Sequence, residues 1–142
     1  MVIDGLSPLL QVFDIPTSVA FYRDVLGFAV VSMSGKNAAD SDWVMLKVGS
    51  STLMLNTAYE RHDRPAAPDS SRIESHRDTI LYFGCDDADA IYAHLRSKGW
   101  NAKAPTTTHY GMRQVYTNDP DGYELCFQHA AEKPGEPRGS KP

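Results

Sequence analysis

Side chains that could orient a polar ligand or move a proton recur at every second position of a strand-like segment near residue 125. Glu124, Cys126 and Gln128 share one side of this segment, which follows the turn 118–122. A carboxylate buried without a cation can act as a general base, and a thiol beside a base or positive charge can act as a nucleophile. Glu124 is therefore a candidate general base. Cys126 has no evident partner and is interpreted as a packed thiol.

The other strand-like segments continue this alternation, with aromatic, thioether and amide side chains at one parity. Aromatic walls with a few amides, which offer both a donor and an acceptor, are typical of small-molecule pockets. The candidate ligand-binding residues are Gln11, Trp43, Met54, Asn56, Tyr82, Tyr110, Gln114, Glu124 and Cys126. Two alternatives stay open, since the same face could be a second core or a dimer interface.

The opposite parity is almost wholly apolar and is expected to pack against helices. It consists of Leu10, Val12, Val44, Leu46, Val48, Leu53, Leu55, Leu81, Phe83, Cys85, Leu125 and Phe127.

The elements that must position these faces follow one order twice: strand, helix, strand, strand, strand. In the first half, Asp14 is expected to cap a helix that carries Pro16 in its first turn and ends at Gly27. The strands of the first half are 9–13, 28–33, 43–48 and 52–56. In the second half, Asp86 and Asp87 open the helix. The strands there are 79–85, a weak 101–107, 112–118 and 123–128.

The sequence thus predicts an α+β fold in four parts. Residues 1–58 form the first βαβββ module, 59–78 a linker, 79–129 the second module and 130–142 a disordered tail. The linker is expected to hold a helical turn near 70–76.

Composition excludes several other classes of protein. Among 142 residues, 42% are hydrophobic and the net charge is −4 without a basic cluster, so nucleic acid is not an expected partner. No apolar run approaches the roughly 18 residues of a membrane span, and no signal peptide is recognisable. Cys85 and Cys126 lack CxxC spacing and are expected to be reduced, which favours a cytoplasmic location.

Two segments carry a resemblance to a known family. Residues 10–14 with 18–28 (SVAFYRDVLGF) are similar to the opening strand and "FY…LGF" helix of the vicinal oxygen chelate superfamily, which includes glyoxalases, bleomycin resistance proteins and extradiol dioxygenases. Residues 119–123 (DPDGY) are similar to its closing turn. The resemblance covers about residues 6–128. It implies a glyoxalase-like fold in which paired βαβββ modules form curved mixed sheets around a cup, and it implies a homodimer.

Enzymes of this superfamily hold a divalent metal with His, Gln or Glu at four strand positions. Counting from the resembling segments, these positions fall on Ser7, Met54, Ile80 and Cys126, a poor set of donors for such metals. A shift of two residues would instead bring in Gln11, Asn56, Tyr82 or Glu124, again without histidine. The five histidines, His62, His76, His94, His109 and His129, are interpreted as solvated surface residues.

The leading hypothesis is a metal-free member that binds a small, partly aromatic molecule, with no cofactor and no membrane partner. The alternative is a metal-dependent lyase, isomerase or dioxygenase of the same superfamily, with a divalent metal in a shifted register. A third reading is a dimerisation module without a ligand. Arg113 is expected to be a surface residue.

Overall fold

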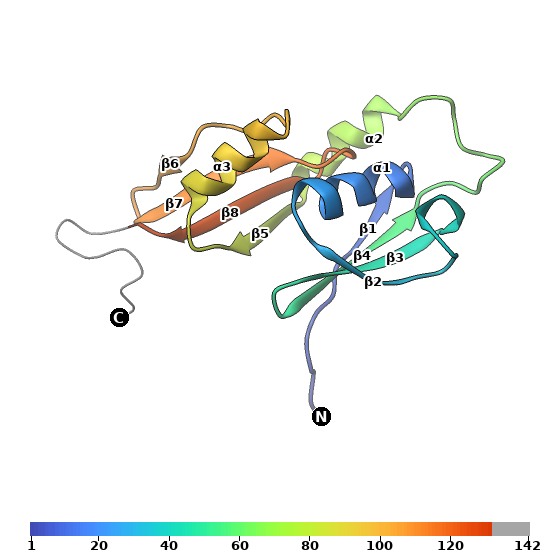
Figure 1. Cartoon of the computed structure of the whole chain (residues 1–142), viewed down its shortest axis with the longest axis horizontal. Coiled ribbons are helices and arrows are strands. Elements are labelled where there is room, and N and C mark those ends of the chain that lie inside the picture. The colour runs from blue at the N-terminus through green and yellow to red at the C-terminus, as the bar shows by residue number, and fades with distance from the viewer. Residues whose placement is uncertain (132–142) are drawn as a thin grey trace. The chain divides into compact units, whose positions relative to one another are not determined.

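The computed structural model describes residues 1–131, which fall into two compact units. The division lies between Ile73 and Glu74, inside the segment predicted as a linker. Each unit combines helices with one four-stranded mixed sheet, and the α+β class is confirmed (Figure 1). The predicted tail lies outside the described residues except for Ala130, which is the last residue of a strand, and Ala131.

The first unit contains β1 (Leu9–Val12), α1 (Ile15–Val19), the π-helical turn η1 (Ala20–Val25), β2 (Ala29–Met33), a short 3₁₀ turn η2 (Ala38–Asp40), β3 (Trp43–Val48) and β4 (Ser51–Thr57). The strand order is β1-β4-β3-β2. β1 runs parallel to β4 and the other pairs are antiparallel, with a bulge in β2 between Val30 and Ser32.

Local chemistry explains the helix of this unit. Asp14 accepts a hydrogen bond from the backbone N–H of Thr17 at 3.0 Å, and Pro16 occupies the first turn, as predicted. The helix widens toward its end, where the N–H of Leu26 donates to the carbonyl of Phe21, five residues back. Gly27 then adopts φ of 80°, the left-handed conformation that ends helices.

The second unit repeats the order. Its elements are η3 (His76–Asp78), β5 (Ile80–Gly84), α3 (Ala88–Ser97), β6 (Thr106–Thr107), β7 (Met112–Asn118) and β8 (Glu124–Ala130), and α2 (Ser70–Ser75) lies at the boundary. The strand order is β5-β8-β7-β6, the same as in the first unit. The weak strand predicted over 101–107 is shorter than expected, because only β6 and one bridge at Ala102 pair with β7, and Pro105 between them has no N–H to donate.

The turn before β8 is organised by Asp119. Its carboxylate accepts hydrogen bonds from the backbone N–H groups of Asp121 at 2.9 Å and Tyr123 at 3.0 Å. Asp119 is itself buried, so these bonds are shielded from water. The turn therefore fixes the point at which β8 begins, and with it the parity of every side chain on that strand.

The apolar parity packs under the helices, as predicted. α1 contacts β4 in the first unit, and α3 contacts β7 and β8 in the second (Figure 1). The buried strand residues of this parity are Leu10, Val12, Val44, Leu46, Leu53, Leu55, Leu125 and Phe127, while Val48, Leu81, Phe83 and Cys85 are half-buried. Within the described residues, no helix has the length and apolarity to cross a membrane.

Candidate functional site

The mixed parity of the second unit gathers five of the predicted ligand-binding residues. The strand register places Cys126 of β8 between Tyr82 of β5 and Tyr116 of β7. The neighbouring row places Gln128 beside Gln114, and Tyr110 reaches Gln114 from the loop before β7. This face of β5, β8 and β7, which we call the polar-aromatic face, carries Tyr82, Tyr110, Gln114, Tyr116, Glu124, Cys126 and Gln128.

Five of these side chains form one hydrogen-bonded network. The hydroxyls of Tyr82 and Tyr116 lie 3.2 Å apart, and Tyr116 donates to Oε1 of Gln114 at 3.2 Å. Nε2 of Gln114 donates to Oε1 of Gln128 at 2.9 Å and to the hydroxyl of Tyr110 at 3.4 Å. Gln114 is buried, whereas Tyr82 and Tyr110 are 53% and 62% exposed. The network therefore runs from a buried centre to two exposed phenols.

Cys126 has no exposed surface at the centre of this face. Burial, the largest effect, raises the pKa of its thiol, while the hydrogen bond between the thiol and Tyr116 acts in the opposite direction. A thiol of raised pKa is a poor nucleophile, so the geometry supports the interpretation of Cys126 as a packed residue. The pKa of Tyr116 is also raised, first by its hydrogen bond with Tyr82 and then by burial, and Tyr116 is a neutral phenol at physiological pH.

Glu124 lies at the end of the same face, paired with Ile80 on one side and Asn118 on the other. It is half-buried and borders a hollow of about 60 Å³. The hollow is lined by Asn101, Ala102, Lys103, Tyr116, Thr117, Asn118 and Glu124. This volume accommodates water-sized groups, whereas drug-sized ligands occupy about 300 Å³ or more. Beside this hollow, Ile80 and Tyr82 are exposed on the same side of β5. The role of Glu124 as a general base stays a prediction.

The first unit brings the other four predicted residues together on its own mixed face. The register aligns Gln11, Asn56 and Trp43 in one row, and it places Met54 between Leu9 and Met45 in the next. Nδ2 of Asn56 donates to Oε1 of Gln11 at 3.4 Å and to the carbonyl of Thr57 at 3.2 Å. This row repeats the combination of amides with an aromatic ring that the second unit carries.

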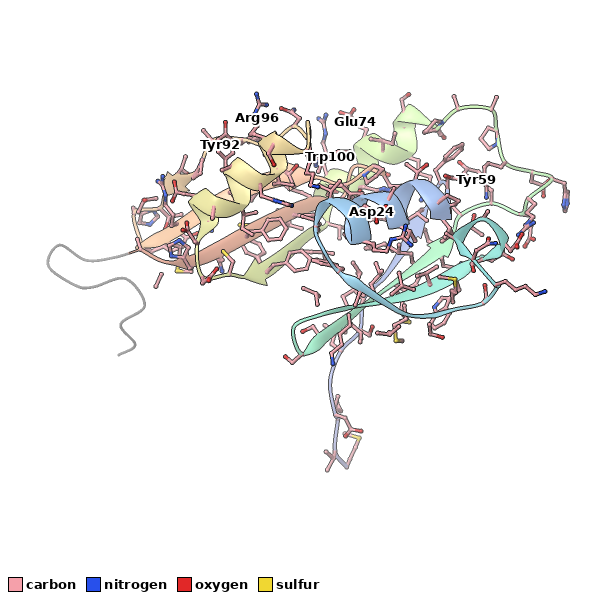
Figure 2. The ribbon with its side chains drawn as sticks, in the orientation of Figure 1. Asp24, Tyr59, Glu74, Tyr92, Arg96 and Trp100 are labelled. Atoms are coloured by element: carbon pink, nitrogen blue, oxygen red, sulfur yellow. The ribbon has the colours of Figure 1, made fainter. Side chains whose placement is uncertain are left out.

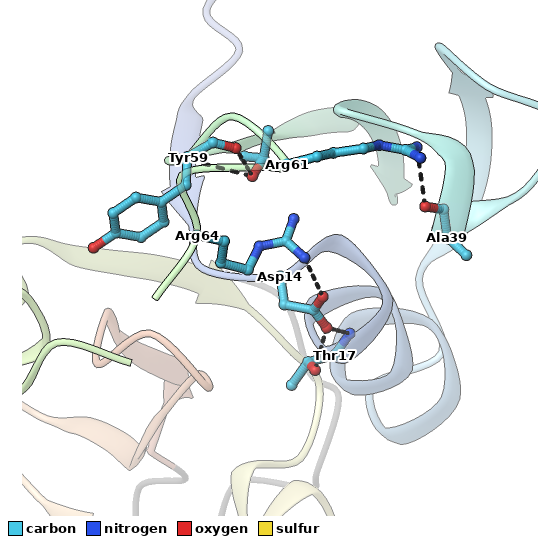
Figure 3. Close-up of polar contacts among 7 residues, drawn as sticks. Asp14, Thr17, Ala39, Tyr59, Arg61 and Arg64 are labelled. Atoms are coloured by element: carbon cyan, nitrogen blue, oxygen red, sulfur yellow. Dashed lines mark hydrogen bonds and ion pairs between the residues drawn. The ribbon is translucent and has the colours of Figure 1, made fainter. Parts of the chain in front are cut away.

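The segment after β4 packs back onto the first unit through arginines (Figure 3). The guanidinium of Arg64 lies 3.4 Å from the Asp14 carboxylate, the residue that caps α1, and 5.9 Å from the centre of the Phe13 ring. Arg72 donates to the backbone carbonyl of Gln11 and lies 6.0 Å from the Tyr59 ring. These contacts order residues that the sequence predicts to be a linker. Tyr59 is labelled in Figure 2 at this end of the unit.

The four positions expected to correspond to the superfamily's metal ligands carry an unsuitable donor set. Ser7 accepts a hydrogen bond from the hydroxyl of Thr52 at 2.7 Å, Ile80 has no donor atom, and Met54 and Cys126 offer sulfur. Magnesium, manganese and iron sites are built from oxygen and imidazole nitrogen. These residues do not fit a divalent metal of that kind.

A different cluster has the right atoms for a metal. Ligand atoms of Asp87, Asp89 and His129 lie within 4.8 Å of one another, at the start of α3 and the end of β8. Nδ1 of His129 faces the carbonyl of Ala130 at 2.9 Å, while Nε2 is buried and makes no hydrogen bond. Arg113 already pairs with Asp89 at 2.7 Å, and this cation opposes a second positive charge. On β8, His129 shares the parity of Leu125 and Phe127, which faces the helices. The cluster therefore lies apart from the polar-aromatic face.

Two expectations about histidines need correction. His76 is not a solvated surface residue, because its ring stacks on Tyr123 at 3.9 Å and its Nδ1 lies 2.6 Å from the carbonyl of Asp121. His129 is half-buried, and its Nε2 is shielded from solvent. Arg113 keeps part of its side chain at the surface, as predicted, and Asp89 on α3 holds its guanidinium. His62, His94 and His109 are exposed, as predicted.

Comparison with known proteins identifies the family. Residues 5–127 match the model of the Glyoxalase/Bleomycin resistance protein/Dioxygenase superfamily, and the chain belongs to this superfamily. The chain is also 35% identical over 116 residues to the uncharacterized protein YaeR of Escherichia coli (strain K12), a match that covers 79% of this chain and 84% of YaeR.

Solved structures agree with this assignment at the level of fold. TnmS3, an antibiotic binding protein from Streptomyces sp. CB03234, superposes with a TM-score of 0.68 at 22% identity, covering 92% of this chain and 99% of TnmS3. A glyoxalase/bleomycin resistance protein from the same organism gives a TM-score of 0.62 at 22% identity, covering 87% of this chain and 97% of that protein.

The cluster around His129 and the position of Lys103 are not predicted by the sequence analysis above. His129 shares the parity of Leu125 and Phe127, and this parity indicates that the His129 side chain points toward the helix. Lys103 precedes Pro105 in an irregular segment without a period, so nothing in the sequence places it beside Glu124.

Proposed function

We propose that this protein binds a small organic molecule, aromatic in part and carrying polar groups, without a metal at the superfamily's four metal positions. The observation that carries the proposal is the polar-aromatic face. It presents two exposed phenols and an exposed aliphatic side chain, Ile80, around a hydrogen-bonded core of glutamine amides. Ligand sites combine apolar contact area with a few fixed polar groups in this way.

The donor set at the metal positions supports the second half of the proposal. Ser7, Met54, Ile80 and Cys126, the positions expected to correspond to the superfamily's metal ligands, have no histidine or carboxylate among them. Sequestration of an antibiotic is one form such binding takes, since TnmS3 shares the fold and is an antibiotic binding protein.

The binding test uses the full chain after removal of metal with EDTA. Thermal-shift screening against aromatic antibiotics and metabolites, followed by calorimetric titration, is expected to find a ligand that stabilises the protein. Tyr82→Ala is expected to abolish the shift. Tyr92→Ala is the matched control, because Tyr92 lies on α3, away from this face (Figure 2). An unchanged shift in Tyr82→Ala would place the ligand elsewhere and contradict the proposal.

The metal test refills the stripped protein with nickel, zinc, manganese and iron in turn and measures bound metal. Tight, stoichiometric metal that is lost in Cys126→Ala, Met54→Leu or Glu124→Gln would defeat the metal-free proposal in favour of a metal-dependent enzyme. Metal that still binds in all three variants but is lost in His129→Ala would belong to the cluster of Asp87, Asp89 and His129 instead.

A further inference from the structure

The network on the polar-aromatic face has a direction, because amide groups have chemically distinct ends. Oε1 of Gln114 can only accept a hydrogen bond and Nε2 can only donate one. Tyr116 has a single proton, and that proton is used in its bond to Oε1 of Gln114. The proton between the hydroxyls of Tyr82 and Tyr116 therefore comes from Tyr82.

The opposite end of the network carries the reverse pattern. Nε2 of Gln114 donates to both Oε1 of Gln128 and the oxygen of Tyr110. Among residues 1–131, no hydrogen bond engages the proton of Tyr110 or Nε2 of Gln128. The end formed by Tyr110 and Gln128 thus offers donors, while the oxygen of Tyr82 offers lone pairs and no proton.

Partners at both ends restrict how this direction can change. Gln114 is 4% exposed, and its amide has a partner at each end. Rotation of that amide alone would set Nε2 against Tyr116 and Oε1 against the Oε1 of Gln128, which places two acceptors in contact, so the direction reverses only when Gln128 rotates as well. Tyr82 and Tyr110 are more than half exposed, so a ligand can reach the two ends that Gln114 orders.

We propose that Gln114 is a specificity-determining residue and that the bound molecule carries two polar groups of opposite kind. A hydrogen-bond acceptor, such as a carbonyl oxygen, faces Tyr110 and Gln128, and a donor faces Tyr82. Tyr82 and Gln128 lie in cross-strand rows that are two residues apart, or about 7 Å along the strands. The acceptor and the donor of the ligand are therefore separated by about the width of one aromatic ring. This inference rests on the proposed function and states which polar pattern that ligand has.

The test uses acetophenone and α-methylstyrene, two probes of the same shape that differ in a carbonyl against a methylene. Titration of the full chain, followed by NMR with labelled tyrosine and glutamine side chains, is expected to show acetophenone binding about fivefold more tightly, which corresponds to one hydrogen bond. The larger shifts are expected at Tyr110 and Gln128. In Gln114→Glu the carboxylate accepts from both of these residues, and the ratio of affinities is expected to fall to about one.

Tyr110→Phe gives a second, independent variant. Tyr110 is exposed, so its hydroxyl can be removed without disturbing the core, and only acetophenone should bind more weakly. Equal binding of both probes, or a larger acetophenone shift at Tyr82 than at Tyr110, would overturn the direction assigned here while leaving ligand binding intact. Failure of both probes to bind at millimolar concentration would instead count against the proposed function.

Discussion

The carboxylate of Asp119 accepts hydrogen bonds from the backbone N–H groups of Asp121 and Tyr123, at 2.9 and 3.0 Å, inside the turn that precedes β8. Asp119 is buried, so neither N–H can turn to water if the carboxylate is removed. We therefore expect Asp119→Ala to lower the free energy of unfolding by roughly 2–4 kcal/mol. Urea unfolding, followed by Trp100 fluorescence in a Trp43→Phe background, measures it.

Asp119→Asn is the matched control for this prediction. The amide oxygen keeps an acceptor for the two N–H groups but removes the charge, so its cost should be clearly smaller than that of alanine. Equal losses in the two variants would show that the charge, and not the acceptor, holds the turn.

The buried thiol of Cys126 predicts a pH dependence of stability. Burial raises the pKa of this thiol in the folded protein above its value in the unfolded chain, near 8.5. The folded state then holds its proton more tightly than the unfolded state at alkaline pH. The contribution of the Cys126 thiol to the free energy of unfolding is fully present below the pKa of the unfolded chain. It is lost as pH rises through the pKa of the folded protein.

Comparison of the native chain with Cys126→Ala between pH 7 and 10 checks the sign. The difference in free energy of unfolding between them should shrink as pH rises. A thiol reagent at pH 8 should also modify Cys126 of the folded protein far more slowly than that of the urea-unfolded protein, because this thiol has no exposed surface. Rapid labelling of Cys126 in the folded chain would contradict its interpretation as a packed residue.

Asp14 contacts both the first turn of α1 and the segment that follows β4 (Figure 3). It caps α1 through the N–H of Thr17 and pairs with Arg64 at 3.4 Å. Asp14→Ala is expected to cost about 1 kcal/mol for the cap, with at most a similar amount for the partly exposed ion pair. Asp14→Asn keeps the cap and removes the pair, so chemical unfolding of the two variants separates the contributions. If Asp14→Asn lowers the free energy of unfolding as much as Asp14→Ala does, the loss comes from the ion pair with Arg64 and not from the cap.

The sequence predicts well what depends on neighbours along the chain. Asp14, Pro16 and Gly27 bound the first helix through local hydrogen bonds and backbone conformation, and the period of two separates the apolar parity from the mixed one. Contacts within the candidate site depend instead on cross-strand register. The pairing of β7 with β8 determines which amide side chain contacts Gln114, and no residue type in the sequence indicates that pairing.

The contact between His76 and Tyr123 illustrates the limit most clearly. These residues are far apart in the sequence, and His76 lies in a polar segment without a period, so the sequence alone indicates a solvated side chain. The ring is instead stacked on Tyr123, with an angle of 10° between the planes, and its Nδ1 donates to the carbonyl of Asp121. The segment before β5 is thereby attached to the turn before β8.

Substitution of His76 separates these two contacts. His76→Ala removes both the stacking and the hydrogen bond and is expected to lower the free energy of unfolding by about 1–2 kcal/mol. His76→Phe keeps an aromatic ring against Tyr123 but leaves the Asp121 carbonyl without its donor, and it should recover only part of that loss. His62→Ala is the matched control, because His62 is exposed and should change stability little. If His76→Ala unfolds at the same urea concentration as His62→Ala, the ring does not hold the turn, and the attachment inferred here is wrong.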